Sequence, residues 1–129
     1  MWKGNYFNFI REGFYKRMGG FNEVVLATGK RLDSYIPGKE IVSRKFTQLG
    51  NVAVDTAKGY IDELATKYAP GTVIKNTTRN ADAIAQGGEK LAGEMILEVP
   101  KQTKQIADEV IEYADEVGVK IRDVLGNIY

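Results

Sequence analysis

Apolar residues recur at helical spacing in three segments of the chain. Residues three or four positions apart share one apolar face over 5–18, over 52–68 and from Pro100 to Val117. Proline is well tolerated in the first turn of a helix, so Pro100 is expected to open the third of these segments. The pattern therefore predicts three helices.

The first of these segments is rich in aromatic side chains. Because the aromatic residues follow the helical spacing, we expect them in the hydrophobic core. Two alternatives stay open: they could stack on nucleic-acid bases, or they could contact the rest of a larger parent protein. The apolar stripe is Tyr6, Phe9, Ile10, Phe14 and Met18, and Trp2, Phe7 and Tyr15 add to the aromatic density around it.

Strand-like runs separate the helices. Residues 23–49 contain two or three antiparallel strands joined by short turns, one of them at Pro37-Gly38. Residues 94–99 form a short strand, and its continuous apolar centre predicts an inner strand that is buried on both faces. The last strand spans residues 119–124.

The order of these elements predicts the fold class. A hairpin followed by a right-handed parallel crossover gives a small mixed β-sheet flanked by helices, in the α/β or α+β class. The polar stretch 75–93, with a short helix at 81–85, is a long connection of the kind that is usually functional or mobile. A length of 129 residues predicts a single domain over 1–129.

The chain has no cysteine and no histidine. The missing cysteine excludes disulfides, thiolate zinc sites and cysteine nucleophiles. The missing histidine excludes Ser-His-Asp triads and histidine-based ribonuclease chemistry. Any metal must therefore be a hard cation held by oxygen atoms, most simply Mg²⁺.

The net charge of +1 conceals an asymmetry along the chain. Residues 1–50 carry nine basic and four acidic residues, a net +5, whereas residues 51–129 carry nine basic and thirteen acidic ones, a net −4. A basic part can face a polyanion, although such imbalances also arise by chance in short chains. Gln48 could contact a phosphate or a metal-bound water molecule, but we favour the simpler interpretation that it is an ordinary polar residue at a strand end. If nucleic acid binds, the candidate contacts are Lys16, Arg17, Lys30, Arg31, Arg44 and Gln48.

Nothing in the sequence resembles a membrane-spanning segment, because no apolar run approaches the roughly 18 residues that are needed to cross a bilayer. The N-terminal residues are aromatic and basic and lack the apolar stretch of a signal peptide. We therefore expect that the chain either acts in the cytosol or is exported as part of a larger protein.

The stretch DSYIPGKEIVSRK, residues 33–45, places reactive side chains on both sides of a turn. Side chains on a strand alternate between faces, so Ser43 and Lys45 point the same way, and Asp33 lies across the turn on the partner strand. Asp33 could hold Mg²⁺, and Lys45 could orient a water molecule or stabilise negative charge on a phosphate. The simpler alternative is a surface hairpin, since Asp-Ser beside Pro-Gly is a common turn composition.

The order of elements resembles the restriction-endonuclease-like core, α-β-β-β-α-β, with a final helix–strand unit. That superfamily carries an Asp near the end of its second core strand and a Glu/Asp-any residue-Lys triplet on its third. The resemblance implies that Asp33 and Lys45 match the Asp and the Lys, and that Ser43 stands where the acid would be. It also implies a second metal-binding carboxylate from elsewhere in the chain. The candidates are Glu40 and, on the following helix, Asp55, Asp62 and Glu63.

A second resemblance covers more of the chain, from about residue 30 to the end. It rests on the strings KRLDSYIPGKEIVSRKFTQL, AKGYIDELATKYAPGTVI, LAGEMILEVP and GVKIRDVLGN. They look like the C-terminal domains of bacterial polymorphic toxins, the variable tips of Rhs-repeat and contact-dependent-inhibition proteins. The resemblance implies a domain exported as part of a larger bacterial protein, toxicity in the cytoplasm of a target cell, and a cognate immunity protein.

These observations predict a metal-dependent nuclease toxin, with DNA preferred over RNA as the substrate. One alternative is a non-enzymatic module that binds nucleic acid or protein through its basic part. Such binding to nucleic acid would weaken steeply with salt and would not depend on metal. Another alternative is an immunity-type partner that blocks some other toxin.

Overall fold

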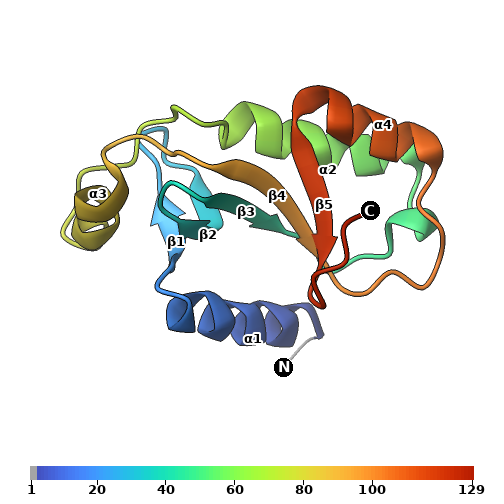
Figure 1. Ribbon diagram of the computed structural model, residues 1–129, viewed down its shortest axis with the longest axis horizontal. Helices are drawn as coiled ribbons and strands as arrows, with labels where there is room; N and C mark the ends of the chain where they lie inside the picture. Colours follow the sequence, from blue (N-terminus) through green and yellow to red (C-terminus); the bar gives the residue numbers. More distant parts are fainter. Residues whose placement is uncertain (1–2) are drawn as a thin grey trace.

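Figure 1 shows the computed structural model, which describes residues 3–129 as a five-stranded mixed sheet with helices on both faces. Helix α1 lies on one face, α2 and α4 pack on the other, and α3 lies at one end. None of the helices within residues 3–129 is long and apolar enough to cross a membrane. The elements are α1 (Lys3–Arg17), β1 (Phe21–Val25), β2 (Arg31–Ile36), β3 (Glu40–Arg44), a 3-10 turn (Leu49–Asn51), α2 (Val54–Lys67), α3 (Ala81–Gly87), β4 (Glu94–Val99), α4 (Asp108–Val117) and β5 (Val119–Asp123).

The five strands follow one another across the sheet in chain order, β1-β2-β3-β4-β5. Strands β1, β2 and β3 pair antiparallel, whereas β4 pairs parallel to both β3 and β5. Helices α2 and α3 connect β3 to β4, and α4 connects β4 to β5. The predicted mixed sheet and its fold class are confirmed, as is the inner position of residues 94–99.

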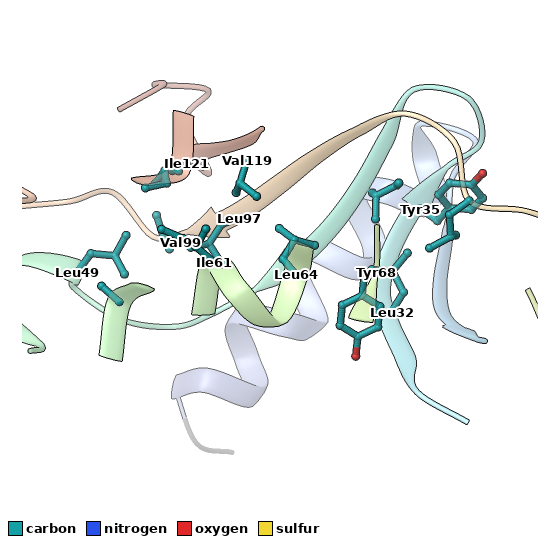
Figure 2. Close-up of a cluster of buried hydrophobic side chains, with 14 of the residues drawn as sticks. Leu32, Tyr35, Leu49, Ile61, Leu64, Tyr68, Leu97, Val99, Val119 and Ile121 are labelled. Carbon is teal, nitrogen blue, oxygen red and sulfur yellow. The ribbon is translucent and has the colours of Figure 1, made fainter. Parts of the chain in front are cut away.

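The main core lies between the sheet and the layer formed by α2 and α4, and Figure 2 shows part of it. Strand β4 contributes Leu97 and Val99, and α2 contributes Ile61 and Leu64. All four side chains are completely buried. Burial of an aliphatic side chain of this size contributes roughly 1.5–3 kcal/mol. The apolar stripe of α2 and the continuous apolar run of β4 therefore hold these two layers together.

The opposite face of the sheet has a smaller apolar cluster, made by Tyr15, Val42 and Ile96. The prediction that the aromatic stripe of α1 belongs to the core is wrong for most of its members. Helix α1 turns Tyr15 and Arg11 toward the sheet because the carboxylate of Glu98, buried there, requires hydrogen-bond donors. The exposed members are Tyr6 (58%), Phe9 (64%), Ile10 (45%) and Met18 (58%), and Trp2 lies outside the described residues.

The segment after β4 also differs from the prediction. Pro100 does not open a helix: residues 100–107 form an irregular connection, and α4 begins at Asp108. The side-chain amide of Gln102 donates to two backbone carbonyl groups and accepts the N–H of Leu49. These hydrogen bonds tie the connection to the segment after β3, which keeps it from coiling into the helix.

Helix α3 occupies part of the predicted polar connection and includes the predicted residues 81–85. Asn80, just before this helix, is buried and donates to the backbone carbonyls of Val25 and Lys75. The connection is therefore fastened to the end of β1.

Candidate active site

The candidate site begins where β2 and β3 part. The last residues paired between these strands are Ser34 and Val42. Beyond this pair, the Oδ2 atom of Asp33 accepts the backbone N–H of Arg44 at 2.7 Å. The hydrogen bond satisfies a backbone donor at the point where the pairing ends, and it places the Asp33 carboxylate at the opening between the strands.

The backbone is irregular on the other side of Asp33 as well. In β1, Glu23 has a φ of 51°, in the left-handed region that side-chain-bearing residues rarely adopt. The residues paired before and after it place Glu23 opposite Asp33. In β2, Leu32 and Tyr35 both enter the main core, so the strict alternation of side chains is interrupted between them. Such strained positions cost about 1–3 kcal/mol and cluster at functional sites, which draws attention to Asp33.

Lys45, the residue after β3, and Glu63 of α2 lie beside this opening. The Nζ atom of Lys45 is 3.4 Å from Oε1 of Glu63 and 5.3 Å from the centre of the Tyr60 ring. The other oxygen of Glu63 is 3.7 Å from Nζ of Lys67. Both Lys45 and Glu63 keep about a third of their side chains exposed, at 31% and 35%. A solvent-borne ligand can therefore reach the pair.

The charges of these residues act on Asp33. Burial raises the pKa of Asp33, and the negative charge of Glu63 raises it further. The backbone N–H of Arg44 and the positive charges of Arg44 and Lys45 oppose this rise, and the net effect is a raised pKa. Asp33, Lys45 and Glu63 therefore form one electrostatically coupled group, although the sequence places the third of them 18 residues beyond the second.

Glu12, the only acidic residue of α1, was not among the predicted site residues. Burial raises the pKa of Glu12, and the negative charges of Glu23 and Asp33 raise it further. Glu12 is thus within electrostatic reach of Asp33 from the α1 side. A signal was present in the sequence, because a lone acid among the basic and aromatic residues of this helix is unusual.

Two other predicted site residues lie on β3. Ser43 is buried near the end of β3, two positions before Lys45. Glu40 lies at the opposite end of β3, where both of its oxygens accept hydrogen bonds from Arg122, at 2.7 and 2.8 Å. The expectation that Glu40 joins Asp33 in one metal site is not met, because the length of β3 separates them. Glu63 is the candidate that lies beside Lys45.

Arg44 was predicted to contact nucleic acid, but the structure places its side chain in a buried network. Its side chain is buried on the α1 face of the sheet, where Nε donates to Glu98 at 2.9 Å and Nη2 donates to Ser34 at 2.6 Å. Burial acts to raise the pKa of Glu98, but hydrogen bonds from Arg11 and Tyr15 and the charge of Arg44 lower it overall. Contact with a phosphate would require Arg44 to leave this buried network.

Of the other residues predicted to contact nucleic acid, some are exposed and some already bind other groups of the protein. Lys16 and Arg17 are exposed at the end of α1. Lys30 is exposed in the turn between β1 and β2, and the neighbouring Arg31 lies 3.9 Å from Glu23. Gln48 donates to one backbone carbonyl and accepts one backbone N–H of the 101–103 segment, which fits the simpler interpretation of a structural polar residue.

The oxygen atoms of this group suit a hard divalent cation. Among residues 3–129, no cluster of three or more Asp, Glu, His or Cys side chains is arranged to hold a metal. Mg²⁺ does not require such a cluster, since it keeps several water molecules and commonly binds through one or two carboxylates together with substrate phosphates. Asp33 and Glu63 are the two carboxylates of the coupled group. Of the alternatives on α2, Asp55 is exposed, and Asp62 accepts the hydroxyl hydrogen of Tyr113.

Comparisons with known proteins return no match: no family model, no curated protein and no solved structure is significantly similar to this chain.

Proposed function

We propose that this chain is a metal-dependent nuclease that hydrolyses nucleic acid, with DNA preferred over RNA. The observation that carries the proposal is the coupling of Asp33, Lys45 and Glu63, which come from β2, the end of β3 and α2. Two carboxylates beside a lysine are a suitable set for phosphodiester hydrolysis, and the chain has no histidine or cysteine for a histidine-based or thiol-based mechanism.

In this proposal Asp33 and Glu63 would hold Mg²⁺ through their carboxylate oxygens. The bound ion would polarise the phosphate and lower the pKa of a water molecule. The Asp33 oxygen that does not accept the Arg44 N–H is available for this role. Both oxygens of Glu63 face lysine ammonium groups, so a cation must compete with Lys45 and Lys67 for that carboxylate.

Lys45 acts on the reacting group. An ammonium group released from Glu63 stabilises the negative charge that develops on the phosphate in the transition state. The water oxygen forms a bond to phosphorus and gives up a proton to solvent, the bond from phosphorus to the leaving ester oxygen breaks, and that oxygen takes up a proton from solvent. Ser43 lies two positions before Lys45 and contributes packing to this wall of the site.

The biological setting is part of the same proposal. The resemblance to the C-terminal domains of polymorphic toxins supports a domain that is exported as part of a larger bacterial protein and acts in the cytoplasm of a target cell. A cognate immunity protein would then neutralise the nuclease in the producing cell.

The test is cleavage of supercoiled plasmid and of total tRNA, with Mg²⁺ or with EDTA, by the wild type and by Lys45→Ala. Lys58→Ala is the matched control, because the two lysines have closely similar surroundings. Lys58 lies 3.7 Å from Glu109 and 5.5 Å from the centre of the Tyr113 ring, and its side chain is 32% exposed, against 31% for Lys45. Loss of either exposed ion pair changes stability by no more than about 1 kcal/mol.

We expect Mg²⁺-dependent cleavage by the wild type and by Lys58→Ala, and a loss of at least about a hundredfold in Lys45→Ala. Cleavage that persists in EDTA, or that is equal in the two lysine variants, contradicts the proposed mechanism. If no substrate is cut by the folded wild type, the chain is better described as a binding module, and its affinity for nucleic acid should then fall steeply with salt.

A further inference from the structure

An apolar groove lies directly beside the end of β3 that carries Lys45. It has a volume of about 520 Å³, within the range of sites that bind small organic molecules. One wall is the N-terminal half of α1, and the other is the end of β5 with the residue that follows Lys45. The lining residues used here are Lys3, Tyr6, Phe7, Ile10, Phe46 and Val124.

The aromatic side chains of the groove are exposed but held in place. Phe46 is 49% exposed and Tyr6 is 58% exposed. The rings of Phe46 and Phe7 have their centres 5.2 Å apart with an interplanar angle of 55°, in the range of favourable aromatic pairs. Phe46 is therefore supported from α1 while part of its surface stays open to a ligand.

The charges around the groove are positive. Lys3 and Arg11 line it, Arg11 with its guanidinium paired to the buried Glu98, and among residues 3–129 no acidic side chain lines it. Lys16 and Arg17 add two exposed cations at the other end of the same helix. An anionic ligand with a flat apolar part would match both the charge and the aromatic surface.

We propose that this groove binds an unpaired base, so that the substrate class of the neighbouring site is nucleic acid with single-stranded character. Aromatic side chains stack on bases of any sequence, and nearby cations bind the phosphates that connect them. Phe46 packs against α1 and Lys45 lies beside Glu63 of α2, but the two residues are consecutive at one end of the sheet. A strand whose base stacks on Phe46 would therefore have to pass around this end of the sheet to bring a phosphate to Lys45. The inference rests on the proposed nuclease function and adds the class of substrate to it.

Binding can be measured without cleavage. The protein carries Lys45→Ala in EDTA, and the probes are a fluorescently labelled oligothymidylate and a labelled DNA duplex of the same length, followed by anisotropy. We expect tighter binding of the single strand. Phe46→Ala should weaken single-strand binding by about fivefold to a hundredfold and change duplex binding far less.

Three further variants test whether single-strand binding depends on the aromatic side chains of the groove. Phe46→Trp keeps an aromatic face and should retain single-strand binding. Tyr6→Ala removes a second aromatic wall from an exposed helix position and should also weaken it, which covers the case in which Phe46→Ala fails to fold. Val73→Ala is the control, since Val73 is 44% exposed but lies in the connection between α2 and α3.

Equal affinity for single strand and duplex overturns the inference, as does unchanged single-strand binding by a folded Phe46→Ala. Sedimentation that shows self-association lost in Phe46→Ala would assign the groove to a second copy of the chain and would also overturn it. A wild type that binds single strands through Phe46 but cuts nothing with Mg²⁺ contradicts only the nuclease function and leaves the groove assignment standing.

Discussion

Asp33 and Arg44 are linked by a hydrogen bond at the end of β3, and the backbone and side chain of Arg44 bind partners in different parts of the molecule. The Asp33 carboxylate accepts the backbone N–H of Arg44 at 2.7 Å, while the Arg44 side chain turns away and donates to Glu98 on the α1 face. Asp33 thus belongs to the candidate site, and the side chain of Arg44 belongs to the buried network around Glu98. This arrangement explains why Lys45, the next residue, is free to project toward α2.

Asp33→Asn should change how the stability of the protein depends on pH, and it should also abolish nuclease activity. The pKa of Asp33 is raised in the folded protein, so its contribution to stability is full below the ordinary aspartate pKa of about 3.9 and is lost as the pH rises through the raised value. Wild type should therefore lose stability relative to Asp33→Asn between about pH 3 and pH 7. Urea unfolding at both values measures this difference.

The same variant should lose nuclease activity, because an amide cannot replace a metal-binding carboxylate. A stability difference that grows in favour of the wild type with rising pH would contradict the raised pKa. Unchanged Mg²⁺-dependent cleavage would remove Asp33 from the proposed site.

Glu98→Gln should destabilise the protein strongly. Glu98 is completely buried and accepts hydrogen bonds from Arg11, Tyr15 and Arg44. Removal of its charge leaves two guanidinium groups without a counter-ion in a buried place, and breaking a buried pair costs about 3–5 kcal/mol. Denaturant unfolding at neutral pH measures the loss. Because the pKa of Glu98 is lowered, its contribution is present above the ordinary glutamate pKa and is lost as the pH falls through the lowered value.

Glu94→Gln is the control for this experiment on the same strand. Glu94 is 58% exposed and pairs with Lys120, which is itself 52% exposed. Its replacement should cost no more than about 1 kcal/mol. Comparable losses in the two variants would show that the buried network does not carry the stability assigned to it.

Arg44→Lys should weaken the fold and leave nucleic-acid binding unchanged. A lysine cannot reproduce the separate hydrogen bonds that Nε and Nη2 of Arg44 make to Glu98 and Ser34. Leaving one buried partner unsatisfied costs about 1–3 kcal/mol. Arg31→Lys, at a side chain that is 62% exposed, is the control and should be close to neutral in stability. A folded Arg44→Lys with full stability and reduced affinity for nucleic acid would restore Arg44 as a phosphate contact.

Glu12→Gln should shift the pH dependence of cleavage. The negative charge of Asp33 raises the pKa of Glu12. Because the repulsion between two charges acts on both, removal of the Glu12 charge should lower the pKa of Asp33. The acidic limb of the pH–rate profile should then move to lower pH, since Asp33 must be ionised to bind the metal. Glu112→Gln, at an exposed position of α4 on the far side of the sheet, should leave the profile in place. An unmoved acidic limb in Glu12→Gln would show that the two carboxylates are not coupled.

The elements with strong local patterns were predicted well from the sequence. The hairpin around Pro37-Gly38, the inner strand at 94–99 and the amphipathic helix over 52–68 are present in the structure. Their signals depend on residues within a few positions of one another, through turn geometry and apolar periodicity. The candidate pair of Asp33 and Lys45 comes from the same logic, because a short hairpin brings its two strands side by side.

The choice of Glu63 over Glu40 depended on tertiary structure. Glu40 is nearer to Lys45 in the sequence, but an extended strand carries it away, to Arg122 of β5. Glu63 approaches Lys45 because α2 packs back across the sheet. Distance along a strand grows by about 3.3 Å per residue, so nearness in sequence does not predict a shared site.

By itself, the sequence determined the order of helices and strands and the mixed sheet, and its lack of histidine and cysteine excluded chemistry that depends on those two residues. Only the tertiary structure decided which face of α1 is buried and where Arg44 points. Both follow from the burial of Glu98, whose partner Arg11 is 87 positions away in the chain. A buried carboxylate must find donors wherever the packed layers bring them, and that requirement outweighed the apolar periodicity of the helix.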